Sequence, residues 1–308
     1  MRFLRPGIAA GWALCAVAAA HAAAPEDPAS LLQRAAAAFS NLQYQGTFVY
    51  LHDGRLDAMR VTRSIGPQGS VERLVALTGE RRELVRDASG TRCTLGGGAL
   101  TLAESGRIGL PAPDLGRLAD PESPYLMAVV GRDRVAGHEA LVLDARPRDA
   151  ARYGYRLWIE PQSGMLLGST LIGPNGLAVE QIMFVELALQ APAAAAEPVA
   201  EPASVAAAAT SVPGPDAAWT VADLPEGFRL VGRTADTAPG AQHLLYSDGL
   251  ASVSVYVEPR GTAPTGSHRR GALSVYGRAL DAHQVVVVGD VPPATVERIA
   301  KSVAAPAQ

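Results

Sequence analysis

The chain has little cysteine, little lysine and no long apolar run beyond its first twenty residues. Cys15 and Cys93 are the two cysteines, and Cys15 lies in an expected leader, so no intramolecular disulfide is predicted. For Cys93, a thiol packed within a strand is favoured over a reactive one. A membrane-spanning helix needs about 20 apolar residues. The mature chain is therefore expected to be soluble and exported.

Strong charge of either sign is also missing. The chain has 308 residues, of which 48% are hydrophobic and 19% are charged, so a globular protein is expected. The formal net charge is −3. Such a weak field attracts the chain neither to nucleic acid nor to an anionic membrane. Removal of Arg2 and Arg5 with the leader lowers the net charge to about −5.

The first residues have the pattern of a secretory signal peptide. Arg2 and Arg5 give a positive start, an apolar run covers residues 8–20, and Ala20-His21-Ala22 offers a cleavage site of small residues. Leu14 precedes Cys15 where a lipidated cysteine needs a small residue, which argues against a lipoprotein. Residues 1–22 are therefore predicted to be a signal peptide that directs export.

The next region reads as one helix followed by many short strands. Asp27 can cap a helix that begins at Pro28. The hydrophobic period then changes to two, and turn residues separate successive segments. Proline and short helical patterns interrupt the strands between residues 111 and 130. The predicted strands are 44–51, 56–63, 71–77, 83–87, 91–95, 99–102, 141–145, 153–160, 165–172 and 177–189. This series predicts an antiparallel sheet that curls on itself.

The apolar strand faces predict either a filled core or a cavity. A curved sheet must cover such a face, so the N-terminal helix fills the concavity, which composition favours, or space remains for an apolar ligand. Alternation shows which residues share a face but leaves open which face is concave. The candidate residues for a lipid pocket are Phe48, Tyr155, Leu157, Ile159, Met183 and Val185.

A domain boundary is predicted after residue 190. Residues 191–218 are rich in alanine and proline and have no periodicity, which is typical of a semi-stiff linker. Beyond it, Asp248-Gly249 is a turn between two strands, residues 272–278 and 284–288 read as two more, and residues 292–304 read as a helix. Residues 23–190 and 219–308 are thus expected to form an N-terminal β-rich domain and a small C-terminal α+β domain.

Motifs for catalysis, metals and cofactors are lacking. The histidines show no metal-ligand spacing, no G-x-S-x-G elbow occurs, and residues 96–98 form a glycine cluster without a following G-K-S/T. No catalytic, metal or cofactor site is therefore predicted, and an enzyme is disfavoured. Arg269-Arg270 is a candidate for meeting acidic groups on a partner, although a solvated surface is the simpler reading.

Several segments together resemble one known family. "YQGTFVYLHDGRLDAMRVTR", "RLWIEPQSGMLL", "LPEGF", "LYSDGLASVSVYVE" and "VVVGDVPPATVERIAKSV" stand in this order in the chain. They are similar to the MucB/RseB family, the periplasmic negative regulators of sigma-E (AlgU-type) envelope-stress factors. The resemblance covers nearly the whole mature chain and is most specific in its C-terminal segments.

The resemblance implies a fold, a partner and a ligand. The N-terminal domain would be an unclosed antiparallel β-barrel with helices, similar to lipoprotein carriers. The C-terminal domain would bind the periplasmic domain of a membrane anti-sigma factor (MucA/RseA-like), and the bound regulator would shield that domain from proteolysis. Lipid, lipoprotein or lipopolysaccharide signals would release the complex. The oligomeric state stays open.

The candidate partner-binding residues lie in the C-terminal domain. They are Tyr246, Asp248, Gly249, Arg269 and Arg270, because tyrosine and arginine are common at binding hot spots. A periplasmic lipid or lipoprotein carrier remains the alternative function. A C-terminal domain of its own argues against that alternative, since a carrier does not need one.

Overall fold

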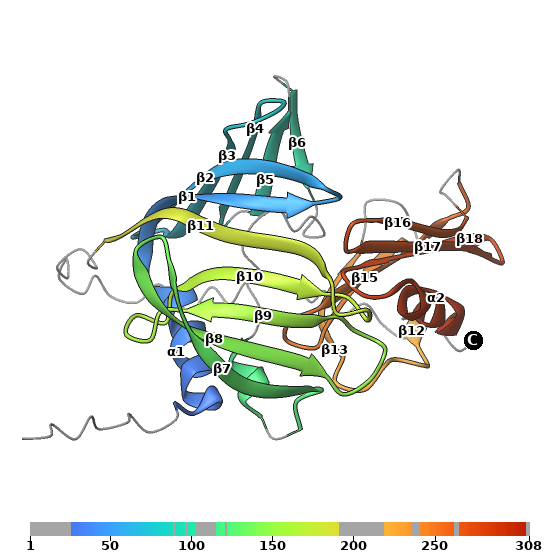
Figure 1. Ribbon diagram of the computed structural model, residues 1–308. Helices are drawn as coiled ribbons and strands as arrows, with labels where there is room; N and C mark the ends of the chain where they lie inside the picture. Colours follow the sequence, from blue (N-terminus) through green and yellow to red (C-terminus); the bar gives the residue numbers. More distant parts are fainter. Residues whose placement is uncertain are drawn as a thin grey trace, which may run out of the picture.

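The computed structural model describes residues 26–88, 90–95, 98–102, 115–120, 122–190, 219–235, 241–261 and 265–305. The expected signal peptide, residues 1–22, and the expected linker, residues 191–218, lie outside these ranges. The described residues form two β-rich domains that lie side by side (Figure 1). As predicted from the sequence, the protein is mostly β, with few helices.

Helix α1 (Pro28–Asn41) opens the N-terminal domain. The Asp27 carboxylate accepts hydrogen bonds from the backbone N–H groups of Ala29 and Ser30, which satisfies donors that the helix itself leaves free. Leu31 and Leu32 are fully buried against the sheet. The predicted cap is therefore confirmed.

Eleven antiparallel strands make a single large sheet. Its spatial order is β6-β5-β4-β3-β2-β1-β11-β10-β9-β8-β7, with β6 and β7 at the two edges, so the sheet does not close. The strands are β1 (Gln43–His52), β2 (Arg55–Gly66), β3 (Gly69–Ala76), β4 (Arg82–Asp87), β5 (Gly90–Leu95), β6 (Gly98–Leu102), β7 (Tyr125–Val135), β8 (His138–Pro147), β9 (Gly154–Ile159), β10 (Leu166–Ile172) and β11 (Ala178–Gln190). This confirms the predicted unclosed antiparallel sheet.

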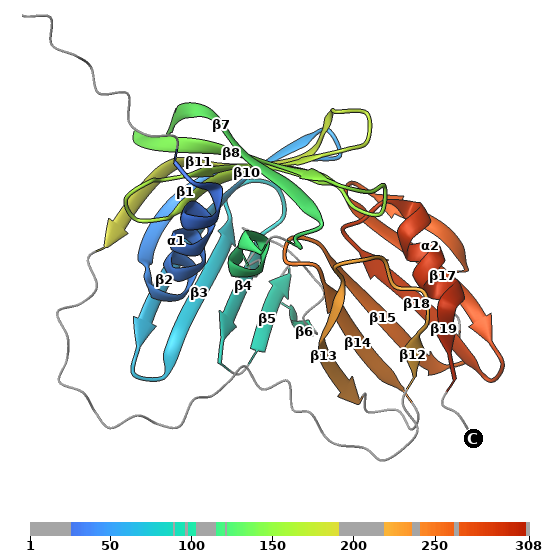
Figure 2. The same cartoon turned by 90° about the horizontal axis from the view of Figure 1, so that it is seen from below.

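The sheet curls around α1 and the short 3-10 helix η1 (Leu115–Ala119) (Figure 2). Leu115 and Leu118 of η1 join the buried cluster that α1 makes with strands β8, β9 and β10. Burial of one leucine side chain stabilises a fold by about 1.5–3 kcal/mol relative to exposure. The N-terminal helix therefore covers this part of the concave face, which was the alternative that composition favours.

Strand β7 differs from the sequence-based expectation. Residues 111–130 were expected to hold proline-interrupted helical patterns, and η1 agrees with this, but β7 begins already at Tyr125. Pro124 comes just before the strand and cannot donate to a ladder, so it is tolerated at a strand's start but not inside it. At the sheet's edge, pairing with β8 keeps the segment extended.

The C-terminal domain is a six-stranded antiparallel sheet with one helix. Its order is β13-β14-β15-β18-β17-β16. The strands are β13 (Arg229–Ala235), β14 (Gln242–Ser247), β15 (Ser252–Pro259), β16 (Gly266–Arg270), β17 (Leu273–Leu280) and β18 (His283–Gly289). The four predicted strands are present, and β13 and β16 are the additional two. Both additions are edge strands, and their sequences, RLVGRTA and GSHRR, lack the apolar alternation by which strands are predicted.

Helix α2 (Pro293–Ser302) packs on this second sheet. Val296 and Ile299 are fully buried, as the helical spacing predicts. A two-residue pair of β12 (Thr220–Val221) and β19 (Val303–Ala304) then ties the two ends of the domain together. The closing helix is thus anchored at its end, and the predicted α+β architecture is confirmed.

Candidate functional site: the interface between the domains

The two domains share a packed boundary with a buried end and an open end. Leu250 and Ala272 of the C-terminal domain are buried in the same apolar cluster as α1 and the N-terminal sheet. The hydroxyl of Thr295, at the start of α2, donates to the backbone carbonyl of Ala151 at 2.8 Å. The boundary therefore combines apolar packing with directed hydrogen bonds.

Arg152 is the centre of the buried end. It lies just before β9, and its side chain is 0% exposed. Its guanidinium donates to both carboxylate oxygens of Asp149 at 3.0 Å, to Asp248 of the other domain at 2.5 Å, and to the carbonyl of Glu226. The ring of Phe228 lies 5.0 Å from the guanidinium carbon. A cation so far from water is stable only because carboxylates and carbonyls surround it.

Asp248 occupies the turn between β14 and β15. One carboxylate oxygen accepts the backbone N–H groups of Leu250 and Ala251, which fixes the turn. The other accepts the Tyr125 hydroxyl at 3.0 Å and the Arg152 guanidinium. Gly249 has a φ of 106°, a value that residues with a Cβ rarely adopt. One aspartate thus shapes a turn of one domain and holds it on the other.

Two further carboxylates lie along the boundary. Glu180 on β11 accepts the backbone N–H of Ala272 at 3.1 Å and a hydrogen bond from the Tyr50 hydroxyl. Burial, with a smaller contribution from the like charge of Asp290, raises the pKa of the Glu180 carboxyl above its ordinary value. Asp290 accepts the Tyr155 hydroxyl at 3.4 Å. Unlike Asp248, Glu180 accepts no hydrogen bond from an arginine of the described residues.

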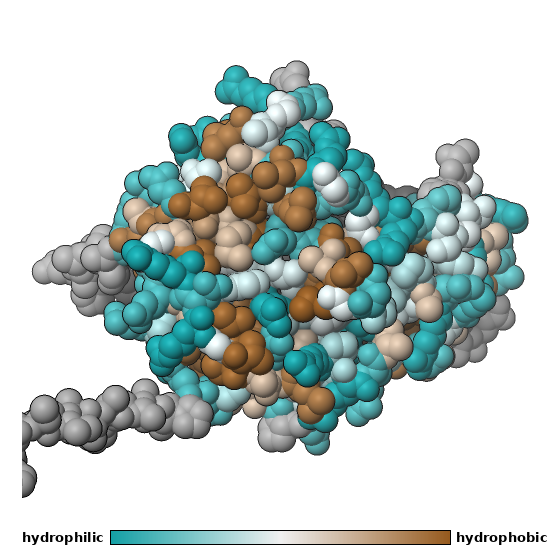
Figure 3. Space-filling model, in the orientation of Figure 1, coloured by the Kyte–Doolittle hydropathy of each residue, from teal (hydrophilic) through white to brown (hydrophobic). Residues whose placement is uncertain are grey.

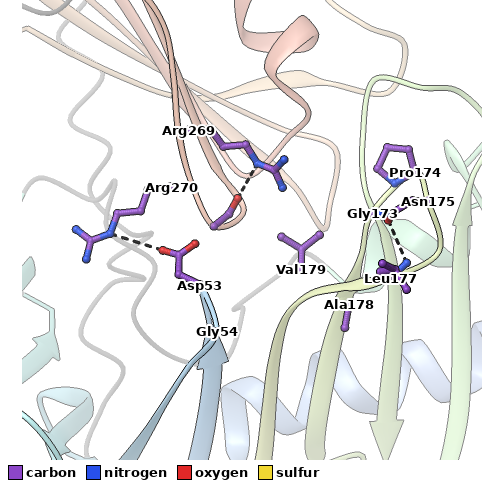
Figure 4. A pocket seen from close by; sticks show the side chains of 11 residues that line it. Asp53, Gly54, Gly173, Pro174, Asn175, Leu177, Ala178, Val179, Arg269 and Arg270 are labelled. Atoms are coloured by element: carbon purple, nitrogen blue, oxygen red, sulfur yellow. Dashed lines mark hydrogen bonds and ion pairs between the residues drawn. The ribbon is translucent and has the colours of Figure 1, made fainter.

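The open end is a groove of about 860 Å³ (Figure 4). Turns and the strand ends beside them line it in both domains: 53–54 between β1 and β2, residues 173–179 from the β10–β11 turn into β11, and residues 269–271 from the end of β16 into its turn. Arg270 Nε lies 3.7 Å from Asp53 Oδ2 across the domain boundary. Arg269 donates to the carbonyl of Gly271 at 2.9 Å. Exposed Leu177 and partly buried Val179 add apolar surface on the N-terminal side.

The structure divides the six lipid-pocket candidates between the two faces of the sheet. Tyr155, Leu157 and Ile159 are buried in the cluster with α1. Phe48 pairs with Phe184 on the same concave side. The remaining two, Met183 and Val185, alternate with Phe184 and lie on the convex side, where Val185 is 55% exposed. Alternation within one strand shows only which of its own residues share a face. Assigning residues of different strands to the same face of the sheet requires the register between the strands.

The five partner-binding candidates also separate. Tyr246 is buried in the core of the C-terminal domain, and Asp248 and Gly249 are buried in the boundary. These three are out of reach of a partner while the domains are docked as they are here. Arg269 and Arg270 are exposed beside the groove.

Arg152 and Glu180 were not among the residues predicted from the sequence. Arg152 lies just before a strand and Glu180 lies within one, and no short-range motif distinguishes either from a solvated side chain. Their partners come from the other domain, at separations of 96 and 92 residues. A polar residue at the border of an apolar strand would have been the only local signal.

An apolar surface covers part of the convex face (Figure 3). Leu51 pairs with Leu56, and Val49 pairs with both Ala58 and Met183 across β1, β2 and β11. Leu51 and Leu56 are exposed large side chains. Contiguous apolar surface of this kind commonly marks an interaction site. It is distinct from the groove, which is bordered by charged residues.

The described residues form neither a metal-binding cluster nor a helix suited to crossing a membrane. Among them, no three histidine, cysteine or carboxylate side chains come together as a metal site would require. None of the helices in the described ranges has the length and apolar character to cross a membrane. Cys93, predicted to be packed within a strand, is buried in β5.

Comparison with known proteins gives matches to both domains. The family model for the MucB/RseB N-terminal domain matches residues 27–204, and that for the MucB/RseB C-terminal domain matches residues 214–304. The sigma factor AlgU regulatory protein MucB of Pseudomonas aeruginosa is 36% identical over 94% of each chain. The sigma-E factor regulatory protein RseB of Escherichia coli K12 is 26% identical over 92% of each chain.

Solved structures agree with these matches. The complex structure of Pseudomonas aeruginosa MucA/MucB aligns with a TM-score of 0.68 and 32% identity, over 92% of this chain and 100% of that one. A crystal structure of MucB alone aligns with a TM-score of 0.66 and 33% identity, over 90% and 97%. Both relatives are named as regulators of a sigma factor, and the family is one of regulatory proteins rather than enzymes. With both of its domains matched over nearly their whole length, the chain belongs to the MucB/RseB family of sigma-factor regulatory proteins.

Proposed function

We propose that this protein is a periplasmic negative regulator of an envelope-stress sigma factor. It binds the periplasmic domain of a membrane anti-sigma factor and shields that domain from regulated proteolysis. The observation that carries the proposal is the match of both domains, over 92% of the chain, to a MucB that was solved as a complex with MucA. Export by the predicted signal peptide, residues 1–22, supplies the compartment.

We further propose that a lipid or lipopolysaccharide-type signal releases the partner. A ligand can do this only if it binds the released arrangement more tightly than the partner-bound one. The boundary between the domains is a suitable two-state element, because one end is buried and fixed and the other is an open groove. Since α1 covers Tyr155, Leu157 and Ile159, an apolar ligand reaches them only if α1 moves.

Titration calorimetry of the full mature chain with the periplasmic fragment of the anti-sigma factor tests the first proposal. Saturable binding is expected, together with slower cleavage of the bound fragment by a protease that cuts the free one. An unrelated exported β-rich protein is the control. Absence of binding at high micromolar concentration would contradict the regulator and favour the lipid-carrier alternative.

Added lipopolysaccharide or fatty acid tests the release step. Coupling between two sites is commonly about 5–150-fold in affinity. The ligand is expected to weaken binding of the fragment within that range, and by linkage the fragment should weaken binding of the ligand by the same factor. If the two bind independently, the release proposal is wrong, while the regulator proposal stands.

A further inference from the structure

We propose that strand β16 (Gly266–Arg270) binds an extended acidic segment of the anti-sigma partner by strand addition, with its acidic side chains at Arg269 and Arg270. This rests on the proposed function and specifies how that partner is recognised. The surface joins an uncovered sheet edge to the groove between the domains.

The backbone of β16 is arranged to accept a further strand. Among the described strands it is the last of its sheet and pairs only with β17, through registers such as Arg270 with Leu273. The two-residue turn makes Arg270 and Leu273 a hydrogen-bonded pair, and such pairs alternate along an antiparallel ladder. Ser267 and Arg269 therefore direct their N–H and C=O groups away from β17, toward the place of an added strand.

The side chains of this edge leave room for a partner. Ser267, His268, Arg269 and Arg270 are all exposed, so the described residues leave these side chains open to solvent. Neighbouring residues in a strand point to opposite faces. Figure 4 shows the two guanidinium groups on either side of the hairpin, with Arg270 toward Asp53 and Arg269 toward the groove. Both sides of an added strand would meet a cation.

Charge determines which occupant fits. Two arginines beside each other repel the same edge of a second copy, and edge strands commonly use such charges against self-association. The same pair attracts carboxylates, which arginine binds with charge-assisted hydrogen bonds. Asp53 pairs with Arg270 at 3.7 Å, a loose contact that a partner carboxylate can replace. An acidic peptide therefore fits better than a second copy of the chain.

Charge reversal gives the first test. We expect Arg269→Glu with Arg270→Glu to weaken binding of the periplasmic fragment about tenfold at low salt and less at high salt. The matched control is Arg132→Glu with Arg134→Glu on β7, which is also an edge strand. Arg134 donates to the turn carbonyl of Gly137 much as Arg269 donates to that of Gly271. Equal effects of the two double variants would overturn the proposal.

Asp53→Asn gives a test of opposite sign. It removes the acid that competes for Arg270, so binding of the fragment is expected to tighten by roughly twofold to threefold, again less at high salt. Unchanged or weaker binding would contradict a role for Arg270 in holding a carboxylate. Since Asp53 and Arg270 are both exposed, neither variant is expected to impair folding.

Backbone pairing is tested by hydrogen exchange of the full chain with and without the fragment. The amides of Ser267 and Arg269 should exchange more slowly in the complex. Ser267→Pro should weaken binding, whereas Ser267→Ala should not, and both should unfold at the wild-type temperature. Unprotected amides in a saturated complex would refute strand addition. If the wild-type chain does not bind the fragment at all, the proposed function itself fails.

Discussion

Two arginine–aspartate pairs cross the same domain boundary and differ in almost every physical respect. Arg152 and Asp248 are both 0% exposed and 2.5 Å apart. Arg270 and Asp53 are 81% and 34% exposed and 3.7 Å apart. The buried pair is enclosed by a tyrosine hydroxyl, backbone amides and an aromatic ring, and the exposed pair borders a groove. The same type of ion pair thus holds the two domains together at the buried end, whereas at the exposed end it can exchange its aspartate for another carboxylate.

This difference indicates how the domains can move without separating. A buried charge that loses its partner is costly, so the end at Arg152 resists opening. The end at Arg270 is exposed to solvent, and an exposed ion pair contributes little to the free energy that holds the domains together. Motion is therefore expected to pivot about the buried end and to change the width of the groove. Gly227 lets the two domains approach closely at the buried end, because a Cβ at this position would lie only 2.8 Å from Pro124 of the other domain.

The largest effect is expected at Arg152. Arg152→Met leaves the Asp248 carboxylate buried without its cation, and breaking a buried pair in this way costs about 3–5 kcal/mol of unfolding free energy. Urea denaturation of the full chain measures it. The control is Arg298→Met, which removes an exposed pair with Asp223 and should cost about 0–1 kcal/mol. Equal losses of unfolding free energy in the two variants would show that the buried pair at the boundary stabilises the fold no more than an exposed pair does.

A smaller effect, with a defined pH dependence, is expected at Glu180. Burial raises the pKa of this carboxyl in the folded chain above its ordinary value of 4.5. The stability linked to the raised pKa is fully present below pH 4.5 and is lost as pH rises through the folded-state pKa. Glu180→Gln keeps an acceptor for the Ala272 N–H without the charge. We expect it to raise the unfolding free energy at neutral pH.

The pH profile of this variant decides the cause. The advantage of Glu180→Gln over wild type should shrink as pH falls and vanish below about pH 4.5, where the carboxyl is protonated in both states. Thermal unfolding between pH 4 and pH 8 measures the difference. An advantage that does not change with pH would mean that packing, rather than the charge, explains the effect.

Local features of the fold could be predicted from the sequence, whereas the boundary could not. Asp27 caps α1 and Val296 faces the core because capping and helical period act over a few residues. Strand β7 was missed in part because edge pairing with β8, rather than propensity, keeps it extended. Arg152 meets Asp248 only after both domains have folded, and no pattern links positions 96 residues apart.

The candidate surface was predicted only in part for the same reason. Arg269-Arg270 stands out as two adjacent charges, and the structure leaves both exposed. Asp248 also stands out, as a turn residue, but the turn faces the other domain and is buried by it. Whether a turn meets solvent, a partner or another domain depends on contacts that lie far away in sequence.

The smallest effect on stability is expected at Arg270. Arg270→Ala removes only the loose contact with Asp53, and exposed pairs contribute about 0–1 kcal/mol. Urea denaturation should therefore place this variant within error of wild type, in contrast to Arg152→Met. Its binding of the anti-sigma fragment should nevertheless weaken, because the groove loses one of its two cations. If Arg270→Ala lowered the unfolding free energy as much as Arg152→Met, both ends of the boundary would be fixed, and the domains could not pivot about the buried end.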